Sequence, residues 1–145
     1  MKLMTNSLVL ALALAFSSGV MAAKSSISDN SYQATKDRIE ADYKSDKANC
    51  ETLSGNMKDI CIAEAKGKEK VAKAELEARK KNTAKNRHDV QVARAEAAYE
   101  VAKEKCDDKT GNDRDACMKE AKAEQQRAKA NAEAKKKDSD TDARK

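Results

Sequence analysis

The chain has 145 residues and a formal net charge of +5, with 30 Lys and Arg against 25 Asp and Glu, no Pro and no Trp. Ala, Lys and Glu dominate after residue 34, and such a composition without helix breakers is typical of long helices. Large apolar side chains are few, which excludes a fold held mainly by a sizeable hydrophobic core. Because isolated helices need tertiary packing to be stable, we expect an all-α protein with an additional stabilising device.

The segment 1–22 has the pattern of a secretory signal peptide. Lys2 precedes the apolar run Leu8–Phe16, and small residues lead to Ala22, where cleavage is expected, with Ala23 as the alternative. The apolar run is about half the roughly 20 residues that span a bilayer, which disfavours an uncleaved membrane anchor. We therefore expect an exported protein that resides in the periplasm of a bacterium.

The rest of the chain divides into five predicted segments. They are a flexible lead-in at 23–33, a first helical hairpin at 34–81, a polar junction at 82–88, a second hairpin at 89–131 and a charged, frayed tail at 132–145. The pattern leaves open whether residues 57–108 form one helix or break near 82–88. A continuous or gently kinked helix shared by both hairpins is favoured, since Gly67 alone does not stop a helix in this context.

An internal repeat relates the two hairpins. The segment 38–66 aligns with 94–122 without a gap, and 13 of the 29 positions in this window are identical. The matches include Tyr43 with Tyr99, both cysteines of each pair and a Gly-Asn dipeptide, which biased composition does not explain. The sequence therefore predicts a duplicated helix–turn–helix unit.

A tight turn is predicted at the centre of each unit. Gly55 is expected to end the first helix in the left-handed conformation. Asn56 is expected to be the N-cap of the next helix, with Asp59 as the acidic member of a capping box. The second unit repeats these residues as Gly111, Asn112 and Asp115.

The four cysteines lie in two pairs, Cys50 with Cys61 and Cys106 with Cys117, one on each side of a predicted turn. In an oxidising compartment such facing pairs form disulfides, each worth about 3 kcal/mol in the chain-entropy model. A zinc site is the alternative, but these spacings match no common zinc pattern, and a catalytic dithiol more often has the C-x-x-C spacing. Three connectivities are open, and the repeat favours pairing within each unit. We therefore predict two tandem disulfide-stapled antiparallel helical hairpins.

A basic stretch from Lys66 to Arg87 has nine Lys and Arg against three Glu. Such a stretch predicts attraction to an anionic lipid or lipopolysaccharide surface, and a solvated helix face is the alternative. Nucleic acid is not an expected partner, because the chain is predicted to be exported and has no interleaved base-stacking aromatic residues. The candidate binding residues are Lys66, Lys68, Lys70, Lys73, Arg79, Lys80, Lys81, Lys85 and Arg87.

No catalytic, metal-binding or cofactor-binding motif is found in the sequence. His88, the only histidine, lies between Arg87 and Asp89 and is predicted to be a solvated surface residue. The carboxylates lie beside Lys and Arg, without the desolvated pair that acid–base chemistry needs. Neither a Gly-rich phosphate loop nor a nucleophile motif is present. We therefore expect a protein that is not an enzyme and needs no cofactor.

The run DRIEADYKSDKANCETLSGNMKDICIAEAKGKEKVAKAELEAR and its echo AAYEVAKEKCDDKTGNDRDACMKEAKAE carry a resemblance to a known group. They resemble a family of small exported proteobacterial Ala/Lys/Glu-rich proteins with paired-cysteine helical repeats, usually hypothetical or loosely labelled TolA-like cell-envelope proteins. The resemblance implies a structural or interaction role, with envelope components or other periplasmic proteins as partners, and supplies no catalytic residues. A periplasmic stress-related chaperone that buffers unfolded clients is the alternative function. The sequence does not define the oligomeric state.

Overall fold

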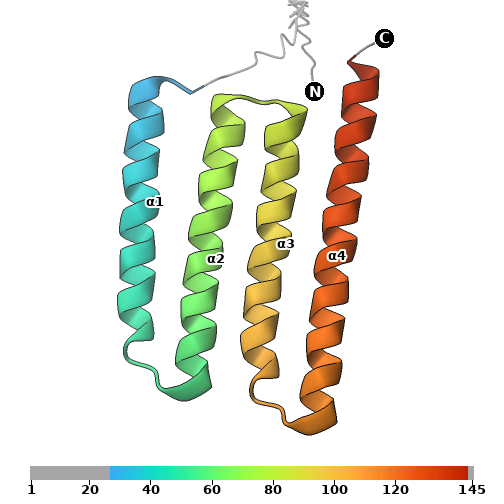
Figure 1. Ribbon diagram of the computed structural model, residues 1–145. Coiled ribbons are helices and arrows are strands. Elements are labelled where there is room, and N and C mark those ends of the chain that lie inside the picture. Colours follow the sequence, from blue (N-terminus) through green and yellow to red (C-terminus); the bar gives the residue numbers. More distant parts are fainter. Residues whose placement is uncertain (1–26, 144–145) are drawn as a thin grey trace, which may run out of the picture.

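Four α-helices and no β-strand make up residues 27–143, the part of the chain that the computed structural model describes. The helices are α1 Asp29–Cys50, α2 Gly55–Lys80, α3 Ala84–Cys106 and α4 Gly111–Asp142. They run alternately up and down, so that α1 with α2 and α3 with α4 form antiparallel hairpins (Figure 1). The predicted all-α fold of two tandem hairpins is confirmed. The expected signal peptide at 1–22 and the first residues of the lead-in lie outside the described residues.

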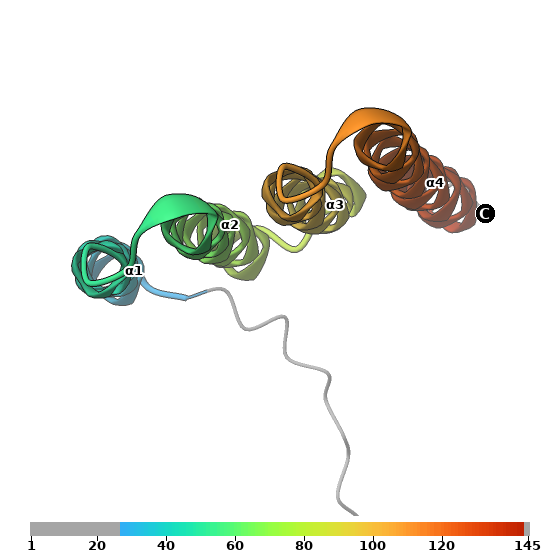
Figure 2. The same ribbon diagram turned by 90° about the horizontal axis from the view of Figure 1, so that it is seen from below.

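The four helices form a single layer. Contacts between helices join α1 to α2, α2 to α3 and α3 to α4, and no other pair of these helices is in contact. Viewed end-on, the helices stand side by side in one row rather than around a common centre (Figure 2). The central helices α2 and α3 therefore each have two neighbours and two open faces, whereas α1 and α4 form the edges of the layer.

Each hairpin buries four side chains at matching positions of the repeat. In the first hairpin they are Ile39, Cys50, Ala65 and Leu76. The equivalent positions of the second hairpin are also buried, and they are Ala95, Cys106, Ala121 and Ala132. Two large aliphatic side chains of the first hairpin are thus replaced by Ala in the second. The duplication extends to the packing, but the second hairpin has the smaller core.

Small residues allow α2 and α3 to approach closely at the middle of the layer. Gly67 of α2 is buried against Ala97 of α3, where a Cβ atom added to Gly67 would lie 2.9 Å from the Cβ atom of Ala97. Real Cβ atoms essentially never approach so closely. The absence of a side chain at Gly67 therefore sets the spacing between the two hairpins.

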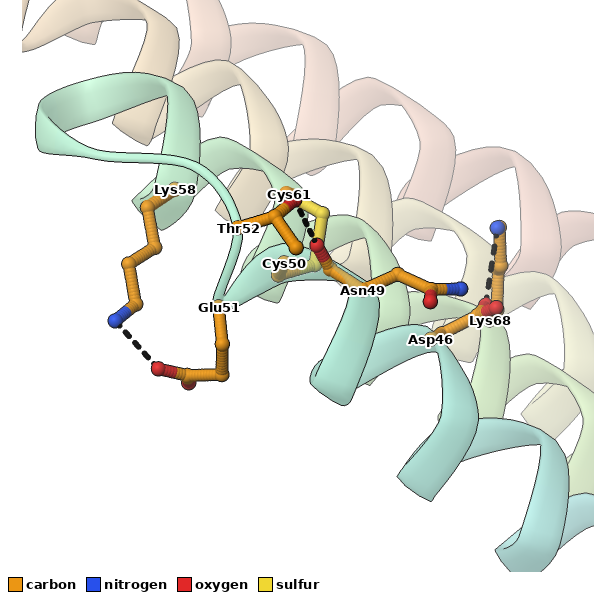
Figure 3. Close-up of a disulfide and its surroundings, with 8 residues drawn as sticks. All are labelled: Asp46, Asn49, Cys50, Glu51, Thr52, Lys58, Cys61 and Lys68. Carbon is orange, nitrogen blue, oxygen red and sulfur yellow. Dashed lines mark hydrogen bonds and ion pairs between the residues drawn. A yellow bond between two sulfur atoms is a disulfide. The ribbon is translucent and has the colours of Figure 1, made fainter.

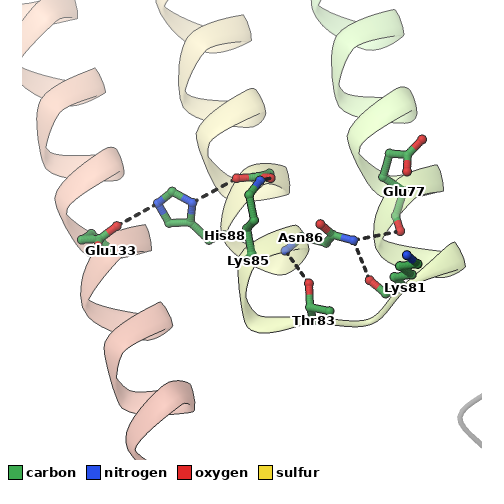
Figure 4. Close-up of polar contacts among 8 residues, drawn as sticks. Glu77, Lys81, Thr83, Lys85, Asn86, His88 and Glu133 are labelled. Carbon is green, nitrogen blue, oxygen red and sulfur yellow. Dashed lines mark hydrogen bonds and ion pairs between the residues drawn. The ribbon is translucent and has the colours of Figure 1, made fainter.

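Helices α2 and α3 are separate because polar side chains cap both sides of the connection between them. Thr83 is the N-cap of α3, and its hydroxyl accepts a hydrogen bond from the backbone N–H of Asn86 at 3.0 Å. The Asn86 side chain donates to the carbonyl of Lys81 at 2.8 Å, at the end of α2 (Figure 4). Such bonds satisfy backbone groups that a helix end leaves free. The favoured continuous or gently kinked helix over 57–108 is therefore wrong, and residues 84–88 of the expected junction belong to α3.

The first helix begins earlier than the composition indicates. The side chain of Ser28 caps α1 by accepting a hydrogen bond from the backbone N–H of Ser31 at 3.3 Å. Because Ser, with its short side-chain oxygen, is a favourable N-cap residue, the helix starts at Asp29. The expectation of a flexible lead-in at 23–33 is wrong for residues 29–33.

The last helix continues through the segment 132–145, which is predicted to fray, as far as Asp142. Ala132 is buried within this segment, and Glu133 approaches His88 of α3 at 3.2 Å. Contacts with the first turns of α3 therefore support the additional helical turns. The predicted fraying is wrong for residues 132–142.

Candidate functional site

Both cysteine pairs form disulfides within their own hairpin. Cys50 is joined to Cys61 and Cys106 to Cys117, and the Cα–Cα distance is 5.6 Å in each case. The first cysteine of each pair is fully buried, at the end of α1 or α3. This pairing confirms the prediction from the repeat. The two turns that the disulfides close lie at the same end of the layer (Figure 1), and Figure 3 shows the first disulfide with its surroundings.

An ion pair closes each turn beside its disulfide. Lys58 contacts Glu51 at 2.7 Å in the first turn (Figure 3), and Arg114 contacts Asp107 at 2.6 Å in the second. The hydrogen bond and the charge of Lys58 hold the pKa of Glu51 below its ordinary value. Sequence reasoning missed these pairs, because the residues differ between the repeats although the sign of each charge is the same.

The turn glycines adopt the expected backbone conformation at an unexpected place. Gly55 has φ +58° and Gly111 has φ +55°, both in the left-handed region that favours glycine. However, each is the first residue of the second helix of its hairpin, and α1 already ends at Cys50. The prediction that Gly55 ends the first helix is therefore wrong. Instead, three backbone hydrogen bonds between residues 48 and 53 form the turns that follow the end of α1.

The predicted capping residues have other surroundings. Asn56 lies inside α2, and its side chain donates to the backbone carbonyl of Glu104 on α3 at 2.8 Å. It therefore connects the hairpins rather than capping a helix. Asp59 is exposed within α2, and Asn112 and Asp115 are exposed within α4. The N-cap positions belong to Ser54 and Thr110, so the predicted caps and capping boxes are wrong.

Two grooves flank the line of contact between α2 and α3. The first, here called the apolar groove, has a volume of about 690 Å³ and is lined by Lys68 together with small apolar side chains of both helices. The second, the charged groove, has a volume of about 420 Å³ and is lined by Lys66, Lys70 and acidic residues of α3. Gly67 and Ala97 line both grooves. The grooves therefore lie on opposite faces of the layer, separated by the closest contact of the two helices.

The candidate basic residues do not share one surface. Lys66, Lys70, Lys73 and Lys80 follow one another at steps of four, three and seven residues, which places them along the same side of α2. Lys68 lines the opposite face, in the apolar groove, and Arg79 lines a neighbouring hollow that shares Glu75 with that groove. The remaining three, Lys81, Lys85 and Arg87, lie at the connection of α2 to α3 and in the first turn of α3.

Many of these basic residues also have acidic neighbours. Five of the nine form ion pairs: Lys68 with Asp46 at 3.1 Å, Lys70 with Glu96 at 2.5 Å, Lys73 with Glu69 at 2.7 Å, Lys80 with Asp29 at 3.4 Å and Lys85 with Asp89 at 2.6 Å. Hydrogen bonds from Lys85 and His88 hold the pKa of Asp89 below its ordinary value, with Lys85 the larger cause. Binding of this stretch to an anionic surface stays a prediction.

The open ends of the two hairpins are tied by equivalent pairs. The hydroxyl of Tyr32 on α1 donates to the carboxylate of Glu77 on α2, and Lys80 lies 4.2 Å from the centre of the Tyr32 ring. The equivalent positions of the second hairpin are His88 and Glu133, whose side chains meet at 3.2 Å (Figure 4). The hydrogen bond to Glu77 raises the pKa of Tyr32 above its ordinary value.

His88 is not the solvated residue that its polar neighbours predict. Its side chain is 19% exposed, with Nδ1 at 3.3 Å from Asp89 and Nε2 at 3.2 Å from Glu133. The protonated ring can donate to both carboxylates at once. The one signal in the sequence is that His88 occupies the repeat position equivalent to Tyr32. Both residues lie outside the aligned segments 38–66 and 94–122.

Within residues 27–143, no group of three or more His, Cys, Asp and Glu side chains is placed to hold a metal ion. None of the four helices has the length and apolar character needed to cross a bilayer. The side chains that the described part of the chain buries are all apolar or disulfide-bonded.

No protein family, curated protein or solved structure matches the chain.

Proposed function

We propose that the chain is a non-enzymatic protein of the bacterial cell envelope, exported to the periplasm, with a structural or interaction role. The observation that carries this proposal is the single layer of two disulfide-stapled hairpins, in which the described residues leave both faces of α2 and α3 uncovered. Disulfides are typical of exported proteins. A stapled layer with long open helix faces suits a protein that acts by presenting a fixed surface to a partner.

Site-specific photocrosslinking in intact cells tests the proposal. A photoreactive amino acid is placed at Lys66, which lines the charged groove, and in a second strain at Asp108, in the exposed turn between α3 and α4. We expect the probe at Lys66 to give a discrete adduct with an envelope component in the periplasmic or membrane fraction. The probe at Asp108 controls for random collision.

Two results would contradict the proposal. One is recovery of the protein in the cytoplasmic fraction with free thiols. The other is an adduct pattern at Lys66 that matches the pattern at Asp108.

A further inference from the structure

The apolar groove lies on one of the two open faces of the layer and is lined mainly by apolar side chains. Small apolar side chains of α2 and α3 line it between the two helices: Val71, Ala72, Ala97, Ala98, Val101 and Ala102. Each of them is at least partly exposed to solvent. Helices usually bury such a stripe against another element, and stable domains are generally built from two or more packed layers. The described residues supply only one layer.

Charged residues stand along this groove in an alternating order. The order follows from contacts between the helices, because Gly67 lies level with Ala97 and the Asn56 side chain reaches the carbonyl of Glu104 nearer the disulfide end. Along the groove, from the disulfide end to the open end, the charged lining residues are Lys105, Glu64, Lys68 and Glu75. Reversing this order places an acidic residue opposite each of these two basic ones. Within the chain, Glu75 also pairs with Arg94 at 2.7 Å and Lys68 with Asp46 at 3.1 Å.

The spacing of these charges is close to symmetric about the contact between Gly67 and Ala97. Glu75 lies eight residues beyond Gly67 in one direction, and Lys105 lies eight residues beyond Ala97 in the other, roughly 12 Å along the helix in each case. Glu64 and Lys68 lie close to the centre, on either side of it. A two-fold axis through this contact, perpendicular to the helices, would bring Glu64 of each copy near Lys68 of the other.

We propose that a second copy of this chain packs antiparallel on the apolar groove and forms a two-layer homodimer. When two copies face each other antiparallel, the basic groove residues of one copy lie opposite the acidic groove residues of the other. An isologous interface requires such self-complementarity. Helices of the length of α2 and α3, side by side, present a face of about 700 Å² per copy. If the whole of this face is covered in both copies, a total of about 1,400 Å² is buried, which lies within the range of standard interfaces. The charged groove lies on the other face and stays free, so this proposal is independent of the proposed function.

Sedimentation equilibrium of the oxidised, exported chain tests the dimer. We expect a mass of two chains at concentrations in the range of about 10–100 μM. In the dimer, Glu64→Lys places a lysine near Lys68 of the other copy at both symmetry-related positions. We expect this repulsion to raise the dimer dissociation constant about tenfold or more. Combining Glu64→Lys with Lys68→Glu exchanges the two charges, and we expect this double variant to restore dimerisation.

Matched variants separate the interface from general effects of charge and folding. Glu100→Lys changes the net charge by the same amount as Glu64→Lys but lies in the charged groove, and we expect it to leave the dimer intact. Ala98→Glu introduces a charge at the centre of the apolar groove while keeping a good helix former, and we expect a helical monomer by circular dichroism.

The proposal is overturned if the unmodified chain is a monomer throughout this range. It is also overturned if an assembly persists unchanged in both Glu64→Lys and Ala98→Glu, since another surface would then be responsible. If the groove instead holds the N-terminal segment or a helix of another protein, the chain is a monomer, and the proposal is overturned by the first of these results.

Discussion

The ammonium group of Lys129 on α4 donates to the carboxylate of Glu96 on α3 at 2.7 Å. Lys70 of α2 reaches the same carboxylate at 2.5 Å, so one acidic side chain connects three of the four helices. The hydrogen bonds from Lys129 and then Lys70 hold the pKa of Glu96 below its ordinary value. In the first hairpin the equivalent residues are Glu40 and Lys73. There the hydrogen bond to Glu69 is the main cause that raises the pKa of Lys73, and the charge of Glu40 adds to it.

Glu96→Gln is expected to reduce stability at neutral pH but not in acid. Because the pKa of Glu96 is depressed in the folded protein, its contribution is present above the unfolded pKa of about 4.3 and is lost as the pH falls through the folded value. We expect the variant to lower the free energy of unfolding at pH 7 by about 1 kcal/mol. Urea unfolding at pH 7 and pH 3 measures the difference. Glu100→Gln, an exposed neighbour, is the control, and an equal loss at both pH values would argue against the charge effect.

Removal of the second disulfide is expected to release α4 more readily than removal of the first releases α1. Each disulfide closes a loop with a sequence separation of 11 and is worth about 3 kcal/mol. The second hairpin has Ala at the positions where the first has Ile39 and Leu76, so smaller apolar side chains hold its two helices together after the cut. Hydrogen exchange of the Cys50→Ala/Cys61→Ala and Cys106→Ala/Cys117→Ala variants compares the two. Equal protection of α1 and α4 would refute the expected asymmetry.

Leu76→Ala tests how far the larger core stabilises the first hairpin. Leu76 is 3% exposed, and truncation of a buried Leu to Ala costs about 2–5 kcal/mol. We expect the midpoint of urea unfolding to fall, with α1 losing most protection. Met57→Ala is the matched control, because Met57 is 68% exposed. A comparable loss in both variants would show that the burial of Leu76 is not the source.

Gly67→Ala is expected to destabilise the contact between the hairpins. The added methyl group would meet the Cβ atom of Ala97 at 2.9 Å, and overpacking of this kind costs about 1–3 kcal/mol. The gain in helix propensity, about 1 kcal/mol, offsets part of this cost. Thermal unfolding measures the balance, and Ala97→Gly in the same chain should relieve the clash. A higher melting temperature for Gly67→Ala alone would contradict the close approach of α2 and α3.

His88→Tyr should preserve the tie at the open end of the second hairpin, whereas His88→Ala should remove it. Tyrosine supplies a donor for Glu133, as Tyr32 does for Glu77 in the first hairpin. We expect a loss of about 1 kcal/mol for His88→Ala and a smaller change for His88→Tyr. A double-mutant cycle with Glu133→Ala isolates the pair. If the two substitutions were additive, the contact would contribute nothing to stability.

The sequence predicts the elements of this fold better than their ends. The repeat and the cysteine spacing are sufficient for the hairpins and for both disulfides, because antiparallel pairing of two helices follows from a tight turn. The connection of α2 to α3 is not predictable in the same way. Thr83 and Asn86 are polar residues in a polar run, and their capping role depends on which backbone groups are left free at that point.

The candidate site shows the same limit. Asn56 and Asn112 occupy equivalent positions of the repeat. Asn56 lies on α2, beside the second hairpin, and donates to the carbonyl of Glu104 on α3. Asn112 lies on α4, at the edge of the layer, where no further hairpin is described. Likewise, the basic stretch is continuous in sequence but wraps around α2, which divides Lys66 and Lys68 between opposite faces. Periodicity identifies the side chains on one stripe of a helix. It does not identify the helix that lies beside each stripe, and this arrangement determines which side chains share a surface.

The pairing of each cysteine with the next one in the chain has a consequence for assembly. If the chain is exported as proposed, it emerges from the membrane beginning at its N-terminus. Cys50 then meets Cys61 before Cys106 has appeared, since most of α2 and nearly all of α3 separate the two pairs. The order of emergence alone therefore directs the correct connectivity, and the first hairpin can be oxidised and closed while the second is still being translocated. A protein built in this way has little need for an isomerase to correct its disulfides.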